Sequence, residues 1–124
     1  MVRPKTVILD RAYFREAARR WRAANREYVR ILYHRAIDKT KKEVLTYYGN
    51  GSCACVNCGE KDIDVLTIDH VANNGKDERG GRERGGGYIF YRRLRSLGFP
   101  PGYQTLCANC NLKKEVMRRR ALRA

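Results

Sequence analysis

The sequence predicts an α+β protein in which a small two-stranded core lies between a long basic N-terminal helix and a basic C-terminal helix. Apolar residues recur at alternating spacings of three and four near the start of the 124 residues, which is typical of an amphipathic helix. Two short apolar runs, 65–68 and 103–107, each lie beside a C-x-x-C pair and are predicted to be strands. We expect a basic helical arm at 1–48 and a compact domain at 49–124.

The N-terminal arm is predicted to be helical from about residue 11 to residue 46. Asp10 is a suitable N-cap, a break is expected near Asp38, and the Gly-Asn-Gly at 49–51 ends the pattern. One face carries an apolar stripe and the other faces carry arginines. The stripe consists of Phe14, Ala17, Trp21, Ala24, Tyr28 and Ile31. The arm is either a packed helix with a solvated basic face or a surface that contacts DNA, a second copy or another protein.

The charge distribution indicates a polyanionic partner. With 27 Lys and Arg against 13 Asp and Glu, the net charge is +14, and nucleic acid is the leading candidate. The segment 51–75 is the exception, because it holds one basic and four acidic residues and is flanked by basic segments. This layout suits an acidic metal-binding centre with phosphate-binding groups around it.

Neither a membrane span nor a secretory signal is expected. The chain has no run of about 18 apolar residues, and its start lacks a secretory apolar segment of useful length. We therefore expect no membrane partner and a cytoplasmic location. Cysteines in a reducing cytosol bind metal more often than they form disulfides.

Four of the five cysteines form two C-x-x-C pairs, Cys55/Cys58 and Cys107/Cys110. Each pair places two thiolates within reach of one ion, and two pairs complete a tetrahedral site, so the pattern predicts structural zinc. Cys53 is the spare cysteine; it could replace Cys55, although the C-x-x-C spacing favours Cys55. A disulfide framework conflicts with the odd count, and a redox pair would need a βαβ setting that is absent.

An acid and a histidine, Asp69 and His70, follow the first predicted strand directly. They could simply cap a turn. However, a metal bound by both cysteine pairs would bring the end of this strand close to the final helix, which is predicted to begin after Cys107. Asn111 in the first turn of that helix would then converge with Asp69 and His70. Between them, the sequence predicts a glycine-rich loop at 71–87 and a short basic helix within 88–102, closed by Gly98 and Pro100.

The segment CVNCG…LTIDHVANNGKDER…YRRLRSLGFPPGYQTLCANCNLKK resembles the HNH endonucleases, especially small phage-type members with two zinc knuckles. The resemblance covers about residues 47–114 and implies a ββα-metal core, which makes 49–124 a zinc-bound HNH nuclease domain. It implies that Asp69 and Asn111 hold a catalytic Mg²⁺ or Mn²⁺ and that His70 is the general base for hydrolysis of DNA, by nicking or double-strand cleavage. Oxygen ligands suit these ions, and histidine can accept a proton near neutral pH.

The sequence departs from the HNH pattern at one position. Gly102 stands where the family usually has an asparagine that orients the base; the Tyr103 carbonyl, Asn73 or Asn74 could replace it. This departure favours the competing interpretation, a catalytically inactive zinc-stabilised DNA-binding protein or an accessory of a phage machine. If the protein is phage-encoded, its location is the host cytosol, and the arm would bind a second copy or a phage protein.

Basic residues around the predicted core are candidates for DNA phosphate contacts. Lys114 lies one helical turn after Asn111 and matches a common lysine of the HNH family. The full candidate set is Arg79, Arg82, Arg84, Arg92, Arg93 and Lys114.

Overall fold

The computed structural model describes residues 10–73 and 87–124. Its elements, in chain order, are α1 (Arg11–Ala24), α2 (Arg26–Tyr48), β1 (Leu66–His70), α4 (Gly87–Ser96), β2 (Tyr103–Cys107) and α5 (Ala108–Arg123). The mixture of helices with a small antiparallel sheet confirms the predicted α+β class. The chain forms two compact units, Met1–Ala36 and Ile37–Ala124, which are described separately below. These units divide within α2, so their boundary does not coincide with the one expected after residue 48.

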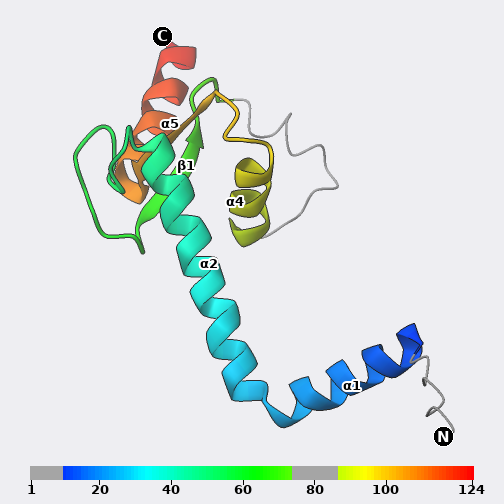
Figure 1. Ribbon diagram of the computed structural model, residues 1–124. Helices are drawn as coiled ribbons and strands as arrows, with labels where there is room; N and C mark the ends of the chain where they lie inside the picture. The colour runs from blue at the N-terminus through cyan, green and yellow to red at the C-terminus, as the bar shows by residue number, and fades with distance from the viewer. Residues whose placement is uncertain (1–9, 74–86) are drawn as a thin grey trace, which may run out of the picture. The chain divides into compact units, whose positions relative to one another are not determined.

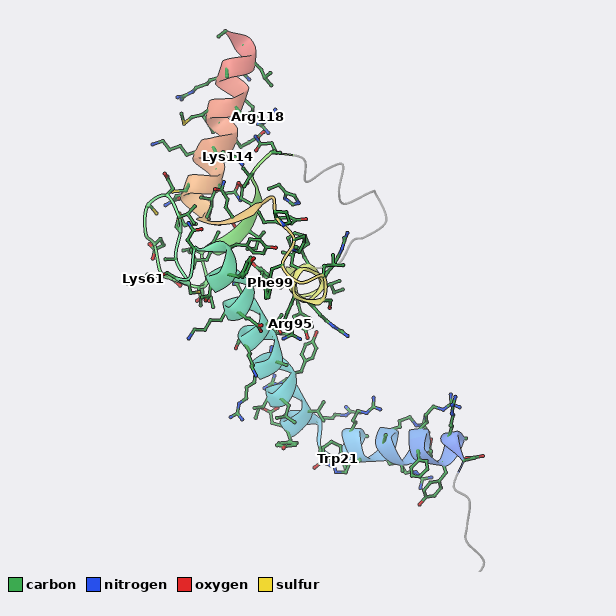
Figure 2. All side chains as sticks on the ribbon, turned by 45° about the horizontal axis from the view of Figure 1, so that its top comes forward. Trp21, Lys61, Arg95, Phe99, Lys114 and Arg118 are labelled. Atoms are coloured by element: carbon green, nitrogen blue, oxygen red, sulfur yellow. The ribbon has the colours of Figure 1, made fainter. Side chains whose placement is uncertain are left out.

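The first unit contains α1 and the start of α2. The Asp10 side chain accepts a hydrogen bond from the Tyr13 backbone N–H at 2.8 Å, which satisfies one of the free donors at the start of α1. None of the residues of α1 is buried. The rings of Trp21 and Tyr28 meet edge to face with centroids 6.2 Å apart, so part of the apolar stripe packs against itself across the helix break. Figure 2 shows Trp21 on α1.

The break in the arm lies at Asn25, and the expected break near Asp38 is wrong. Asn25 leaves helical geometry with φ −121° and ψ 35°, and its side-chain amide donates to the Trp21 carbonyl at 2.7 Å. A short polar side chain that bonds to nearby backbone competes with the helical ladder, which explains the interruption there. Asp38 lies within the continuous helix α2.

The last turns of α2 belong to the core of the second unit. Val44 and Leu45 are fully buried. Leu45 packs in a cluster with Leu66 of β1 and Leu106 of β2, whereas Val44 packs with Leu94 of α4. The Leu45 carbonyl also accepts a hydrogen bond from the buried Thr105 hydroxyl at 2.8 Å. Figure 1 shows this end of α2 together with β1, α4 and α5.

The sheet is a single antiparallel pair, with Leu66 opposite Cys107 and His70 opposite Tyr103. The strand predicted at 103–107 is confirmed. The strand predicted at 65–68 begins one residue later and continues through Asp69 and His70, so the acid and the histidine are part of the sheet. Successive side chains of a strand point to opposite faces, and the two residues therefore face opposite sides.

Helix α4 is shorter than the predicted segment and ends at Ser96. Gly98 takes a left-handed conformation with φ 73°, and the Phe99 N–H turns back to the Leu94 carbonyl at 2.9 Å. The Phe99 ring then stacks on Tyr47 of α2 with centroids 4.4 Å apart. Arg95 donates to the Thr40 hydroxyl of α2 at 3.2 Å, and both Arg95 and Phe99 are labelled beside α2 in Figure 2.

We predict that Leu45→Ala destabilises the second unit by about 2–5 kcal/mol, because a fully buried side chain shared by α2 and both strands would leave a cavity. Urea unfolding of the metal-loaded protein measures this. Leu32→Ala, which shortens a side chain that is 43% exposed, is the matched control and should cost under 1 kcal/mol. Equal losses for both variants would contradict the assignment of Leu45 to the core.

Candidate metal centre and Asp-His site

Four cysteines from two distant segments meet in the second unit. One potential ligand atom from each of Cys55, Cys58, Cys107 and Cys110 lies within 4.8 Å of the others. Among the described residues, this is the one group of three or more His, Cys, Asp or Glu side chains placed to hold a metal ion. Cys53 is not a member, so the geometry agrees with the C-x-x-C spacing. These four residues, the cysteine tetrad, could hold a structural metal such as zinc.

Backbone turns hold the first cysteine pair in place. Gly59 has φ 80°, a left-handed conformation that favours glycine, and its N–H donates to the Cys55 carbonyl at 2.9 Å. The Val56 N–H donates to the Thr105 carbonyl at 3.0 Å, which joins this turn to β2. The two halves of the tetrad are therefore brought together by main-chain hydrogen bonds as well as by the thiols.

The second pair lies where β2 passes into α5. Cys107 is the last residue of β2 and the N-cap of α5, and its sulfur accepts a hydrogen bond from the Cys110 N–H at 3.4 Å. The Asn57 side-chain amide donates to the Cys110 sulfur at 3.2 Å. N–H donors stabilise thiolates, so these contacts suit deprotonated metal ligands.

The pKa values of Cys55 and Cys58 shift in opposite directions. Burial raises the pKa of Cys55. Hydrogen bonds from backbone N–H groups, that of Cys58 foremost, lower it by more than burial raises it, so that the pKa is about 6. The Glu60 backbone N–H lowers the pKa of Cys58, yet the neighbouring thiols of Cys107 and Cys110 raise it to about 12. Cys55 therefore ionises more readily than Cys58. A divalent metal would favour the thiolate form of each ligand, since it binds thiolates and displaces their protons.

Asp69 faces α5. Its carboxylate is almost fully buried and accepts hydrogen bonds at Oδ2 from Gln104 Nε2 at 2.8 Å and from Lys114 Nζ at 2.6 Å. On the same face of β1, the Asn111 amide donates to the Thr67 hydroxyl at 3.2 Å. The fold therefore brings Asp69 and Asn111 to one side of the sheet, against one helix. The predicted convergence of all three residues is wrong, because His70 follows Asp69 within β1 and faces the other side.

His70 lies on the opposite face of β1. Its ring stacks on Phe90 of α4 with centroids 5.8 Å apart, and it meets Tyr103 edge to face at 5.0 Å. These rings restrict the orientation of the imidazole. The sequence placed the Tyr103 backbone near His70, but it did not predict the contacts of the Phe90 and Tyr103 rings with His70. It also did not predict Gln104 as a partner of Asp69. The alternation of side chains along β2 could have indicated these positions. Tyr103 and Gln104 are adjacent in the strand, so their side chains face opposite sides of the sheet.

The position at which the HNH pattern has an asparagine is a turn in this protein. Gly102 has φ 104°, and its carbonyl accepts a hydrogen bond from the Val71 N–H at 3.0 Å. An L side chain is strained at such a φ, so the turn favours glycine. Of the suggested replacements, Tyr103 pairs with His70 in the sheet, and the Asn73 N–H donates to the His70 carbonyl at 3.0 Å. Asn74 lies outside the described residues.

The oxygen ligands fit a divalent ion only in part. Asp69 supplies one carboxylate and Asn111 one amide, which is a donor set that Mg²⁺ or Mn²⁺ accepts when water fills the other positions. However, Lys114 already neutralises Asp69 with an ion pair at 2.6 Å. A second cation would have to share this carboxylate with the Lys114 ammonium group or displace that ammonium group.

The basic residues predicted to contact DNA have different surroundings. Arg92 is exposed and Arg93 is half-buried on α4. Lys114 points to Asp69 rather than to solvent alone. The remaining candidates, Arg79, Arg82 and Arg84, lie outside the described residues.

Comparison with models of known protein families finds no match to this chain, and comparisons with curated proteins and with solved structures find none either. The similarity to HNH endonucleases therefore stays a prediction. Within residues 10–73 and 87–124, no helix has the length and apolar character needed to cross a membrane.

We predict that Cys58→Ser abolishes stoichiometric zinc binding and lowers the melting temperature, because it removes one of four ligands in the tetrad. Cys58 is an exposed residue, so the substitution removes little packing. Zinc content by atomic emission and thermal melting followed by circular dichroism measure the effect. Structural zinc contributes roughly 10–16 kcal/mol of apparent binding free energy, so a strong chelator should unfold wild-type residues 51–124 as well.

The matched control is Cys53→Ser, which removes the cysteine outside the tetrad. It should retain one zinc ion and melt within a few degrees of wild type. A protein that loses zinc equally with either substitution would contradict the assignment of the four ligands.

Proposed function

We propose that this protein is a metal-dependent DNA endonuclease of the HNH type, which hydrolyses phosphodiester bonds by nicking or double-strand cleavage. The observation that supports it best is the shared location of Asp69 and Asn111. Their segments are distant in the chain, yet both side chains lie on the α5 face of the sheet. The next residue after Asp69 is a histidine held between two aromatic rings. Similarity of the motif order to HNH endonucleases adds to this support.

In this proposal, zinc bound by Cys55, Cys58, Cys107 and Cys110 is structural. Four thiolates leave no open position on a tetrahedral ion, so this site binds no substrate. Its role is to hold β2 and the start of α5 against the first cysteine pair. That connection keeps Asn111 beside β1.

The proposed roles of the catalytic residues follow from their chemistry. Asp69 and Asn111 would hold Mg²⁺ or Mn²⁺ through oxygen atoms. When bound, such an ion stabilises negative charge on the phosphate and the leaving oxygen. His70 would accept the proton of the attacking water, and the stacked Phe90 ring and the edge-to-face Tyr103 ring would restrict the orientation of its imidazole.

The charge of the chain supports DNA as the substrate. The whole chain has a net charge of +14. Residues 11–36 of the arm contribute to it with eight arginines and only two glutamates. Two arms placed side by side would repel each other, which favours DNA over a second copy as the arm's partner. A phage protein would need an acidic surface to bind the arm.

A second candidate function is a zinc-stabilised DNA-binding protein without catalysis, acting alone or as an accessory of a phage machine. Two observations favour it. Gly102 replaces the asparagine expected to orient the base, and Lys114 forms an ion pair with the carboxylate that would bind the catalytic metal. Neither the glycine at 102 nor the Lys114 ion pair affects the proposed zinc site or the basic surfaces.

Relaxation of supercoiled plasmid in Mg²⁺ or Mn²⁺ tests the nuclease proposal. We predict that His70→Ala lowers the rate at least about 100-fold, because general-base catalysis contributes roughly 10²–10⁴-fold. His34→Ala is the matched control: it removes the other histidine, which is exposed on α2, and should leave the rate unchanged. Zinc content and DNA affinity of His70→Ala should match wild type, which separates catalysis from folding.

Equal cutting by wild type and His70→Ala would contradict the role of His70 as the base. If clean wild-type protein binds DNA but cuts none of several duplex, nicked and branched substrates, the second candidate function is supported instead.

The arm gives a separate prediction about affinity. Replacing Arg22 and Arg26 with Gln should reduce the salt dependence of DNA binding, with the slope of log K against log salt falling in magnitude by about 2, since each phosphate contact contributes about 0.9. Fluorescence anisotropy across a salt series measures the slope. Lys61→Gln, in the acidic segment, is the control and should leave the slope unchanged. An unchanged slope for the double variant would show that these arginines do not contact phosphate.

A further inference from the structure

The Lys114 ammonium lies in a cradle of three oxygen atoms. It donates to Asp69 Oδ2 at 2.6 Å, to the His70 carbonyl at 2.9 Å and to the Val71 carbonyl at 3.2 Å. The Asp69 side chain is 8% exposed and that of Lys114 is 25% exposed, so the pair is largely shielded from water. The three N–H groups of an ammonium match three oxygen acceptors. Lys114 is therefore held as a bound cation would be.

The cradle has the chemistry of a site for a hard cation. A carboxylate and backbone carbonyls are the oxygen donors that bind Mg²⁺, Mn²⁺ or Ca²⁺ in proteins. Gln104 also donates to Asp69 Oδ2, at 2.8 Å, so this oxygen already has two N–H donors. A divalent ion on the same carboxylate, at roughly 2.1–2.4 Å, would lie close to the ammonium. Two cations this near in a shielded site repel each other strongly.

Lys114 can leave the cradle without unfolding the helix. It lies on α5 one turn after Asn111, and its flexible four-carbon side chain is partly open to solvent. Glu115, the one acidic side chain of α5, is paired with Arg118 and Arg119, which lower its pKa to about 2. A DNA phosphate is therefore a more suitable alternative partner for the Lys114 ammonium than Glu115.

We propose that Lys114 is a displaceable internal cation, which occupies the Asp69 cradle in the free protein and moves to a DNA phosphate when a divalent ion binds at Asp69. This inference rests on the proposed function, because it concerns the same metal site. Its consequence is a thermodynamic coupling: DNA strengthens metal binding by removing the competing ammonium, and the metal strengthens DNA binding by the same factor. The free protein would then bind the divalent ion weakly until DNA is present.

Mn²⁺ binding by the zinc-loaded full chain, followed by the electron paramagnetic resonance signal of the free ion, tests this inference without relying on activity. We expect Lys114→Met to bind Mn²⁺ about tenfold more tightly than wild type in the absence of DNA. Lys113→Met is the matched control, since it removes the neighbouring exposed lysine and the same charge, and should stay within about twofold of wild type. Lys114→Arg retains the charge and should also bind weakly.

The same titrations with a short DNA duplex test the coupling. The duplex should tighten Mn²⁺ binding in wild type and in Lys113→Met, and much less in Lys114→Met. The DNA duplex itself binds some Mn²⁺. Comparison with Lys113→Met under identical conditions corrects for this contribution, because it is the same for both variants. Equal tightening in Lys114→Met would overturn the coupling. Zinc content and circular dichroism should be the same in all variants, and Lys114→Gln provides a second neutral side chain should the methionine perturb the helix.

Asp69→Asn distinguishes failure of the inference from failure of the proposed function. If, with the duplex present, Asp69→Asn binds Mn²⁺ as wild type does, no metal site exists at Asp69, and both proposals are overturned. If Asp69→Asn loses binding while both neutral Lys114 variants bind no more tightly than wild type, the metal site stands and the competition is overturned. Loss in Asp69→Asn together with a gain in Lys114→Met supports both.

Discussion

Four cysteine sulfur atoms that lie within reach of one ion are the constraint on which the second unit depends. The tetrad joins a turn after α2 to the junction of β2 and α5, and these segments are some fifty residues apart in the chain. In a unit with a two-stranded sheet and few fully buried side chains, burial alone provides limited stability. A metal ion bound by the tetrad would therefore add its binding free energy to the stability of the folded unit.

The alternation of side chains along β1 divides the Asp-His pair between two environments. Asp69 enters a polar cluster with Gln104 and Lys114, whereas His70 enters an aromatic one with Phe90 and Tyr103. Adjacent residues are thus positioned independently, the first by α5 and the second by α4. A metal held by Asp69 and a base at His70 would have to act on one phosphate, so the placement of the two side chains on opposite faces of β1 weighs against their joint action and in favour of the non-catalytic candidate function.

Lys114 connects the two charge features of the chain. The protein is strongly basic, and its acidic segment contributes Asp69 to the only part of the described structure where a near-buried carboxylate meets an ammonium group. Such a pair is costly to break by removing one partner, yet it costs less to exchange one cation for another. The ion pair therefore keeps the buried Asp69 carboxylate compensated, and under the proposal above a divalent ion would take the place of Lys114.

The sequence by itself determined the elements and ligands that local spacing encodes. The C-x-x-C pairs identified the four members of the tetrad, the run at 103–107 identified β2, and the glycines marked the ends of helices. Asp69 and Asn111 were placed near each other because a metal between the cysteine pairs requires it. The helix break at Asn25 is local as well, because its amide binds the Trp21 carbonyl four residues earlier. Only the tertiary structure decided the rest. Residues 37–48 join the core because Val44 and Leu45 pack on β1, β2 and α4. The contact between Lys114 and Asp69 spans 45 positions, and it depends on which face of the sheet α5 covers, a choice that no local pattern encodes.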